Sequence, residues 1–445
     1  MSSWRARFQE LSRYPSAVAG GAIIMLLVLL AVYALIGLGQ TRAVTLWRGG
    51  EGVWELNPRQ APPAWLNFFL KVKRPPTMLL GSASSPELKD REDFEGGDAD
   101  ITITFPVDFQ YDEFPREVAV FMTADFKALS PHVSFTWRTP DGREYPLLGQ
   151  RLRAKDAYRI SQDRRVTEMF GREAHIGMFA EPGSDPPRPL KGRYELVVDG
   201  VVFEPESDFE VSFVLYGQLH GLAGTDHMRR DITVALIWGA PIAMAFGLLA
   251  AVGSTLTTLL LAAIAAWYRG WVDGLIQRLN EVFLIVPGLV VLIMVGMLYS
   301  RSIWVILGVV IFMGIFTGIR TFRAMFLQVK EAPYVEAARA YGASNPRIVF
   351  LYLVPRVIPV LVPQFVTLIP GFVFLEATLA VLGLGDPILP TWGKVLNDAF
   401  SNGALYAGHY YWVLAPASLL MFTGLGFAML GFALDRVFNP RLREQ

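Results

Sequence analysis

Few residues of this 445-residue chain could do covalent chemistry. It has no cysteine, which excludes disulfides and thiolate sites, and its 5 histidines do not cluster as metal ligands do. No Gly-x-x-x-x-Gly-Lys-Ser/Thr run is present, so we expect no ATP-binding phosphate loop. Asp and Glu are scattered as on a solvated surface. We therefore expect no catalytic residue, metal ion or cofactor in this chain.

One polar stretch, residues 331–347, has a composition that suits protein docking. It lies between two long apolar segments and is too polar to cross a bilayer. One acid, Glu336, and one base, Arg339, stand among alanines, so another protein can approach the backbone closely. A solvated helix surface is the alternative reading of these charges.

The same stretch predicts two short helices joined at a glycine. Pro333 suits a first helical turn, where its missing N–H costs nothing. Gly342 falls where this helix would end, because glycine tolerates the left-handed conformation. Ser344 or Asn345 can cap a second helix, with Pro346 at its first position.

A second polar feature is an acid inside an apolar segment. A carboxyl group there is costly and is a functional candidate by default. We assign Glu376 and Phe372 to a candidate translocation pathway, while a structural hydrogen bond of Glu376 remains equally open. Prolines and glycines of the apolar segments are read as kinks or close-packing points.

The composition is that of an integral membrane protein with a sizeable soluble part. Hydrophobic residues make up 53% and charged residues 18%, with a mean hydropathy of +0.37. The formal net charge is zero, so nothing suggests nucleic acid. Residues 17–38 are long enough to span a bilayer and follow a basic start. A signal peptide is the alternative, but the apolar run is long and no clear cleavage site follows.

Residues 40–225 read as a mostly β domain, most simply a sandwich. Five segments alternate or are rich in β-branched and aromatic residues: Ile101–Phe105, Glu117–Met122, His132–Trp137, Tyr194–Val198 and Phe209–Tyr216. Pro140-Asp141-Gly142 and Asp199-Gly200 predict turns between strands. Residues 78–98 and 161–188 are expected to be loops, the latter partly helical.

The remaining chain returns to the membrane. Five further spans are predicted, at 236–266, 281–299, 303–323, 357–382 and 411–434. Cytoplasmic loops carry an excess of Lys and Arg. We therefore expect both termini inside. The short outer loops then carry few basic residues beyond Arg301 and Lys394. The inner side carries many: Arg5, Arg7, Arg13, Arg269, Arg278, Arg320, Arg323, Lys330, Arg339, Arg347, Arg356, Arg436, Arg441 and Arg443.

The predicted organisation is therefore an all-α bundle of six transmembrane helices with an inserted β domain. Residues 1–39 form a cytoplasmic tail and the first span. Residues 40–225 form the extracytoplasmic domain, and residues 226–445 a five-helix core with a cytoplasmic loop at 324–356.

The polar stretch resembles the EAA loop of ABC-importer permeases, which reads Glu-Ala-Ala, three residues, then Gly. The resemblance implies that the loop docks in a groove of the ATPase subunit. The residues it assigns to this coupling are Glu336, Ala337, Ala338, Arg339, Gly342 and Ala343. The family pattern then ends in Ile-x-Leu-Pro, of which only Pro355 is kept here.

Further motifs resemble the C-type subunit of oligopeptide, dipeptide and nickel permeases. They are Asn57-Pro58-Arg59, Ala61-Pro62-Pro63, Gly224-Thr225-Asp226, Arg230-Asp231, Gly270-Trp271-Val272-Asp273 with Arg278, Phe283 to Pro287, Glu376-Ala377, Leu382-Gly383-Leu384-Gly385 and Thr391-Trp392-Gly393. Arg229 stands where that family usually has glycine. Residues 66–220 have no counterpart in an ordinary member.

The resemblance implies an importer subunit of the bacterial inner membrane that works by alternating access. Its implied partners are a homologous second permease, two cytoplasmic ATPases that bind ATP and Mg, and an external solute-binding protein. Short peptides or similar solutes are the implied cargo. A membrane-anchored receptor or adhesion module without ATPases is the alternative function. For the β domain we expect a docking or capping role at the pathway mouth.

Overall fold

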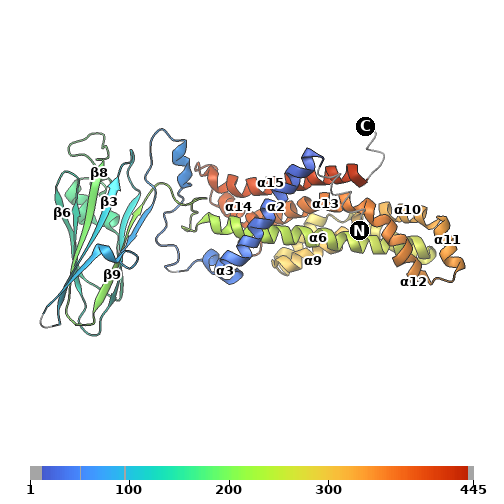
Figure 1. Cartoon of the computed structure of the whole chain (residues 1–445), viewed down its shortest axis with the longest axis horizontal. Helices are drawn as coiled ribbons and strands as arrows, with labels where there is room; N and C mark the ends of the chain where they lie inside the picture. Colours follow the sequence, from blue (N-terminus) through green and yellow to red (C-terminus); the bar gives the residue numbers. More distant parts are fainter. Residues whose placement is uncertain (1–12, 51, 95–96, 439–445) are drawn as a thin grey trace. The chain divides into compact units, whose positions relative to one another are not determined.

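The computed structural model describes residues 13–50, 52–94 and 97–438 (Figure 1). The predicted inner charges at Arg5, Arg7, Arg441 and Arg443 lie outside the described residues. The chain divides into two compact units, Gly49–Thr233 and the combination of Met1–Arg48 with Val234–Gln445.

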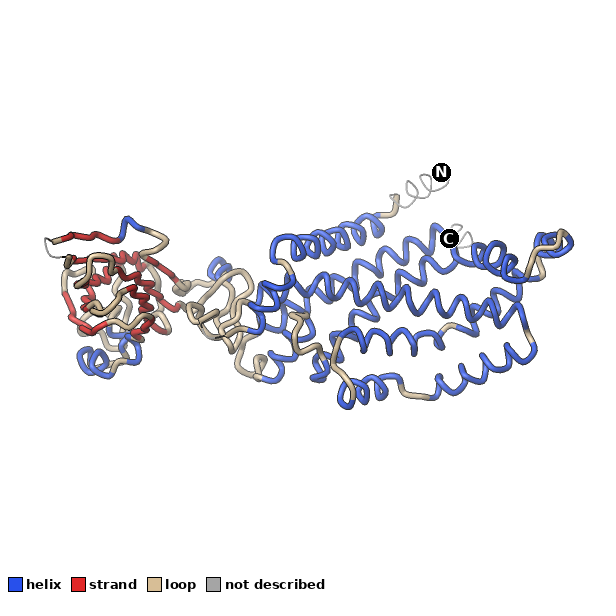
Figure 2. Tube along the Cα trace, turned by 90° about the horizontal axis from the view of Figure 1, so that it is seen from below, coloured by secondary structure: helices blue, strands red, loops and turns tan. Residues whose placement is uncertain are grey.

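The second of these units is helical. Its elements are α2 (Pro15–Tyr33), η1 (Ala34–Leu38), α3 (Gln40–Arg48), α6 (Ile232–Tyr268), α7 (Gly270–Ile285), α8 (Gly288–Leu298), α9 (Ile303–Gly314), η5 (Ile315–Thr317), α10 (Ile319–Lys330), α11 (Pro333–Ala340), α12 (Asn345–Ile348), η6 (Val349–Leu353), α13 (Val354–Leu379), η7 (Ala380–Leu384), α14 (Trp392–Ser401) and α15 (Tyr410–Phe438). Figures 1 and 2 show α11 and α12 at one end of the bundle. In Figure 1, α14 and α3 lie toward the other end.

Apolar length predicts the long helices well. In the described part of the chain, Pro15–Leu38, Ile232–Tyr268, Asn345–Leu384 and Tyr410–Val437 are each long and apolar enough to cross a membrane. They contain the predicted spans 17–38, 236–266, 357–382 and 411–434. The predicted spans 281–299 and 303–323 correspond instead to two helix pairs, bent by 77° and 51°. Pro287 stands at the sharper bend, where it ends α7 and precedes α8.

We call the polar stretch of residues 331–347 the hairpin. The expectation that its second helix is short is wrong. Helix α12 continues without a break through the π-helical segment η6 into α13. The proline kept from the family pattern, Pro355, lies in the first turn of α13. The wide π turn before it changes the local hydrogen-bond register, so the missing N–H of Pro355 does not end the helix.

The other unit holds a β-sandwich. One sheet has the order β1 (Met78–Gly81), β9 (Asp208–Tyr216), β4 (Glu117–Asp125) and β7 (Lys155–Tyr158). The other has the order β2 (Lys89–Asp93), β3 (Ala99–Phe109), β8 (Gly192–Val202), β5 (His132–Arg138) and β6 (Glu144–Arg151). All ladders between these strands are antiparallel. Short helices α4 (Arg164–Phe170) and α5 (Ala174–Gly177) follow β7.

The sandwich core follows from alternation along the strands. In β3, Ile101, Ile103 and Phe105 are fully buried while the residues between them are not. Phe213 of β9 contributes from the other sheet to the same core. All five predicted strand segments lie within longer strands, so the mainly-β prediction is confirmed.

Two local predictions in this unit are wrong. Asp199-Gly200 is no turn but lies inside β8, where Gly200 pairs with Ile101 and Val133. A Cβ on Gly200 would lie 2.4 Å from the ring of Phe209, so the glycine makes room for core packing. Residues 78–98 are not only loop, because they contain β1 and β2. Both are short edge strands, and such strands carry a weak alternation signal.

Candidate functional site

The polar stretch folds locally as its prolines and glycine predict. Helix α11 begins at Pro333 and ends at Ala340. Gly342 has φ +80°, and the next amide, of Ala343, donates to the carbonyl of Ala338 at 3.0 Å. The Gly342 amide donates to the carbonyl of Arg339 at 2.9 Å. These two bonds form a Schellman cap, which requires the left-handed residue that glycine supplies.

The hairpin has an attached face and an exposed face. Val335 and Ala338 are 1% and 7% exposed and pack against their own chain. Glu336, Ala337 and Gly342 are exposed. The six predicted coupling residues therefore split, because Ala338 and the partly buried Ala343 attach the hairpin rather than present it.

Tyr341 extends the exposed face and was not predicted. Its side chain is 93% exposed at the tip of the hairpin, and that of Tyr334 is 39% exposed. A tyrosine directly before the helix-ending glycine is the sequence signal that could have identified Tyr341. Together with Glu336 and Ala337, these rings offer a partner one acidic group, small residues and two aromatic edges.

The hairpin is attached to the C-terminal end of α6. Leu259, Ala262 and Ala266 of α6 form one buried cluster with Val335 and Ala338 of α11. Phe322 and Phe326 of α10, Ile348 of α12 and Val349 of η6 complete this cluster. The hairpin and the end of α6 therefore pack as one body.

Trp267 is the centre of this attachment. The guanidinium of Arg339 lies 4.6 Å and the ammonium of Lys330 5.0 Å from its ring centroid. Lys330 Nζ also donates to the carbonyls of Ala266 and Trp267, at 3.1 and 2.8 Å. A cation at the last carbonyls of a helix is stabilising. The guanidinium of Arg339 therefore stacks on Trp267 of its own chain, while the residue as a whole stays exposed.

An ion pair between Asp273 and Arg323 connects α7 to α10. Asp273 of α7 accepts from Arg323 Nε at 2.7 Å, and its second oxygen contacts the same guanidinium. Such a two-pronged bond constrains orientation as well as distance. Asp273 belongs to the Gly270-Trp271-Val272-Asp273 motif, which thus positions the helix that leads into the hairpin.

The candidate pathway residues lie on α13. Glu376 is 7% exposed, so its carboxyl group is buried within the chain. Phe372 is partly buried between two apolar clusters. The pathway role of Glu376 and its alternative, a structural hydrogen bond, both stay predictions.

Thr391-Trp392-Gly393 joins α14 to α6. Thr391 caps α14 by accepting from the Lys394 amide at 3.1 Å. Trp392 is 1% exposed and donates from Nε1 to the carbonyl of Leu236 on α6 at 2.8 Å. A Cβ on Gly239 would lie 2.2 Å from the Trp392 ring. Gly239 on α6 therefore leaves the space that the Trp392 indole occupies.

Comparison with known proteins decides what this arrangement belongs to. The family described as binding-protein-dependent transport system inner membrane component matches residues 258–444. The glutathione transport system permease protein GsiD of Escherichia coli is 34% identical over 223 residues, which cover 49% of this chain and 72% of that protein. The oligopeptide transport system permease protein OppC of Bacillus subtilis is 30% identical over 222 residues, 50% of this chain and 72% of that protein. The dipeptide transport system permease protein DppC of Bacillus subtilis is 29% identical over 222 residues, 50% of this chain and 69% of that protein.

The chain is an ABC-importer permease of the peptide family. It is an inner-membrane component with several membrane-spanning helices. Permease subunits of this kind are non-catalytic, because ATP hydrolysis lies in partner subunits. The prediction of a permease is confirmed, and the receptor alternative is set aside.

In this permease, the loop before α6 is hydrogen-bonded to residues 58–64, the segment that precedes the β-sandwich. Thr225 Oγ1 donates to the carbonyl of Pro58 at 2.7 Å and accepts from the amide of Ala61 at 3.0 Å. The amide of Ala64 donates to the carbonyl of Gly221 at 3.0 Å. Two motifs on either side of the insertion are thus held together, and the β-sandwich extends from this junction.

Arg229, which stands where the family usually has glycine, has a left-handed backbone. Its φ is +66°, a conformation that costs backbone strain in a residue other than glycine. Its guanidinium donates to the carbonyl of Asn57 at 2.6 Å and to Glu117 at 3.0 Å. It also lies 4.9 Å from the Tyr216 ring centroid. These contacts tie the loop before α6 to β4 and β9.

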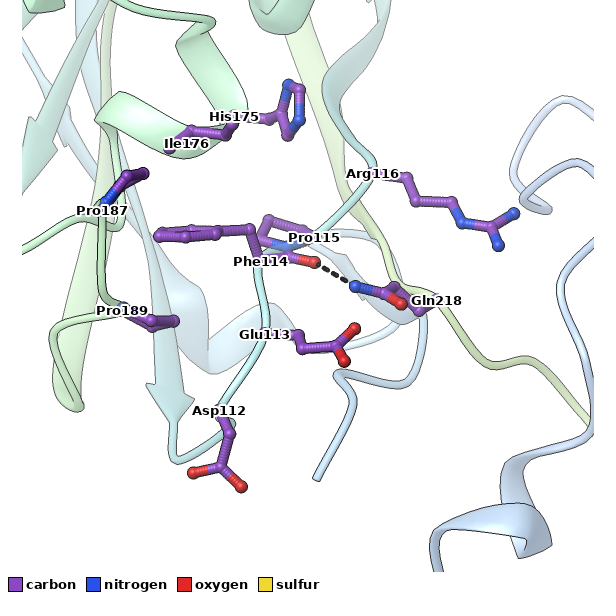
Figure 3. Close-up of a pocket in the computed structure, with 10 residues that line it drawn as sticks. All are labelled: Asp112, Glu113, Phe114, Pro115, Arg116, His175, Ile176, Pro187, Pro189 and Gln218. Carbon is purple, nitrogen blue, oxygen red and sulfur yellow. Dashed lines mark hydrogen bonds between the residues drawn. The ribbon is translucent and has the colours of Figure 1, made fainter. Parts of the chain in front are cut away.

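The β-sandwich unit also carries an open cavity of about 560 Å³ (Figure 3). Phe114, Ile176 and Pro189 line one part of it. Its polar groups are already engaged within the unit: Gln218 donates to the carbonyl of Phe114 at 3.1 Å, and Asp112 accepts from Lys191 at 2.6 Å. In the described part of the permease, no group of three or more His, Asp or Glu could hold a metal ion. We assign no ligand to this cavity.

Replacing Trp267 by alanine should weaken coupling in the permease without preventing assembly. Two cation–π contacts, worth about 0.5–2 kcal/mol each, would be lost together with the packing under α11. The expected result is retained ATPase binding with a clear loss of ATP-driven uptake. Trp267→Phe keeps an aromatic face and should transport nearly normally. Equal uptake by wild type and Trp267→Ala would show that Trp267 has no coupling role.

Proposed function

We propose that this permease forms the translocation pathway with a second, homologous permease. It is driven by two cytoplasmic ATPases and supplied by an extracytoplasmic solute-binding protein. The observation that carries the proposal is the hairpin, which is packed rigidly against α6 and presents Glu336, Ala337 and Tyr341 outward. ATP-dependent closure of the ATPases moves the hairpins, and the attached helices then change the pathway from inward to outward opening.

Topology follows from the same proposal. Counting each bent helix pair as one span gives six spans, and the charge bias places both termini and the hairpin in the cytoplasm. The β-sandwich unit, inserted between the first and second spans, then lies outside the membrane. The names of the relatives support dipeptides, oligopeptides or glutathione-like solutes as cargo.

The coupling residues are Glu336, Ala337 and Gly342 on the exposed face, with Arg339, Ala338 and Ala343 holding the hairpin in place. Co-purification with ATPase subunits tests this assignment. Tagged wild-type permease should retain ATPases and support ATP-driven peptide uptake in proteoliposomes. A chain that purifies without ATPases under conditions that preserve the complex would overturn the proposal.

The pathway assignment of Glu376 and Phe372 is tested separately. Glu376 is buried within its own chain, so we expect Glu376→Gln, which keeps the size and polarity of the side chain, to fold and transport. Glu376→Leu places an apolar side chain at the same buried position and should also fold. A pathway role requires that a stably folded Glu376→Leu variant lose uptake. Wild-type uptake by that variant would exclude the role.

A further inference from the structure

Four large apolar side chains are exposed together near the base of the inserted unit. Trp65 lies in the short helix η2 (Ala64–Phe68), and Phe69 follows it. Phe68 is 85%, Phe69 79%, Leu222 75% and Trp65 46% exposed. We call Trp65, Phe68, Phe69 and Leu222 the aromatic turn. Two adjacent, almost fully exposed phenylalanines indicate a surface that another apolar phase covers.

The aromatic turn is held in a defined geometry. Trp65 Nε1 donates to the carbonyl of Leu222 at 2.9 Å, and the rings of Trp65 and Phe69 meet edge to face at 6.2 Å. Asn67 and Arg74 exchange two hydrogen bonds, of 2.8 and 3.1 Å, across the turn. The exposed rings are therefore presented by a braced loop.

The turn is tied to the start of a membrane-spanning helix. The amide of Ile232, the first residue of α6, donates to the carbonyl of Gly224 at 3.1 Å, two residues after Leu222. Thr225 and Asp231 form an antiparallel bridge in the same loop. Asp231 is the last charged residue before α6, which contains no Asp, Glu, Lys or Arg. The aromatic turn is thus attached where charge ends and the apolar helix begins.

The length of α6 places this start at the outer boundary of the bilayer. The last part of α6, from Leu259, is covered by the hairpin cluster. Residues 232–258 then rise about 40 Å, which matches a bilayer including its headgroups. Ile232 accordingly lies at headgroup level when the hairpin projects from the opposite side.

The flanking charges select an anionic surface. Lys71 and Lys73 are exposed and lie two and four residues after Phe69, whereas Arg74 is paired with Glu113 at 3.5 Å. Lys73 Nζ donates to the carbonyls of Asn67 and Leu70, at 2.6 and 3.0 Å, which keeps its charge beside the rings. Tryptophan and basic side chains beside apolar ones are the composition of a membrane-interface segment.

We propose that the aromatic turn inserts into the outer leaflet of the membrane, with anionic lipid headgroups against Lys71 and Lys73. This inference rests on the proposed topology. A lipid contact at this junction would hold the base of the insertion at the membrane surface beside the first residue of α6.

The absence of cysteine makes a site-specific test possible in the full-length chain. Phe68→Cys carries an NBD fluorophore in vesicles of phosphatidylethanolamine and phosphatidylglycerol, with or without brominated acyl chains. Leu129→Cys, at a position 55% exposed in the loop between β4 and β5, is the matched control. We expect blue-shifted emission and about a twofold loss of intensity with brominated lipid at residue 68, and neither at residue 129. In the labelled Phe68→Cys variant, the additional substitution Lys71→Glu should reduce the quenching by brominated lipid.

Two other outcomes overturn the inference. Emission typical of water at residue 68 would show that nothing covers the turn. Blue-shifted emission without bromine quenching, together with cross-linking of the Phe68→Cys variant to another polypeptide through its thiol, would assign the surface to a protein. Labelling of Leu129→Cys by an impermeant maleimide in intact cells tests the topology independently. External labelling without quenching rejects only the lipid contact, whereas quenching without external labelling rejects only the topology.

Discussion

Gly342→Val is expected to abolish ATP-driven uptake while leaving membrane insertion intact. Gly342 has φ +80°, and nothing lies within 4 Å of a Cβ placed there, so the side chain fits and only the backbone is penalised. A β-branched residue in this conformation costs on the order of 1–2 kcal/mol or more. That cost falls on the Schellman cap between Ala338 and Ala343, which sets the direction in which the hairpin tip points.

Gly342→Asn is the matched control, since asparagine tolerates the left-handed conformation. It should retain ATPase co-purification and most of the uptake. A second variant, Glu336→Lys, reverses a charge on the exposed face without altering the backbone and should lower ATPase co-purification. Normal ATPase assembly and normal uptake by both Gly342→Val and Glu336→Lys would show that the hairpin is not the docking element.

Excision of residues 66–220 is expected to remove most binding-protein-dependent uptake while the permease still inserts and binds its ATPases. The junction allows a clean design, because the Ala64 amide already bonds the Gly221 carbonyl at 3.0 Å. A short glycine linker can therefore replace the insertion between two backbone positions that are neighbours. The bonds of Thr225 to Pro58 and Ala61 remain, so the loop before α6 keeps its own support.

The reason for this expectation is the inserted position of the unit at the proposed pathway mouth. A docking role and a capping role both predict loss of uptake after excision. Only a docking role also predicts that the excised permease binds the solute-binding protein more weakly. The same linker inserted after Leu129 in the intact chain is the control for insertion of foreign sequence. Unchanged uptake after excision would reject both roles.

A coupling element of this kind works through rigidity more than through the strength of one contact. An exposed ion pair of Glu336 with an ATPase would contribute only about 0–1 kcal/mol. In the proposed mechanism, the hairpin and the end of α6 move together, because Val335, Ala338 and Phe326 pack in one cluster with α6 and Trp267 lies between two cations.

The sequence by itself determined the features that depend on local chemistry. Uninterrupted apolar length predicted the long helices, and alternation predicted the five central strands. Each of these patterns is contained in one continuous segment of the sequence. Pro333 and Gly342 predicted the bounds of α11, since each acts through its own backbone. The motifs around Glu336 and Thr391 were enough to indicate the permease family.

Only the tertiary structure decided features that join distant segments. Trp267, Lys330 and Arg339 lie on three helices, so no local pattern reveals that they stack. Asp199-Gly200 has turn-like residues yet forms a strand, because the ring of Phe209 requires the space of a missing Cβ. Arg229 was recognised as a departure from glycine, but its left-handed backbone and its bonds to Asn57 and Glu117 became visible only in the fold.

The six residues assigned to coupling show the same division. Sequence placed them on one hairpin, and the fold then separated the exposed Glu336, Ala337 and Gly342 from Ala338 and Ala343, which pack against the chain. Arg339 is exposed, yet its guanidinium stacks on Trp267. A helix presents different faces to different neighbours, and which neighbour occupies a face depends on segments tens of residues away. Local residue types thus predicted the hairpin, and packing against α6 decided which of its side chains are exposed.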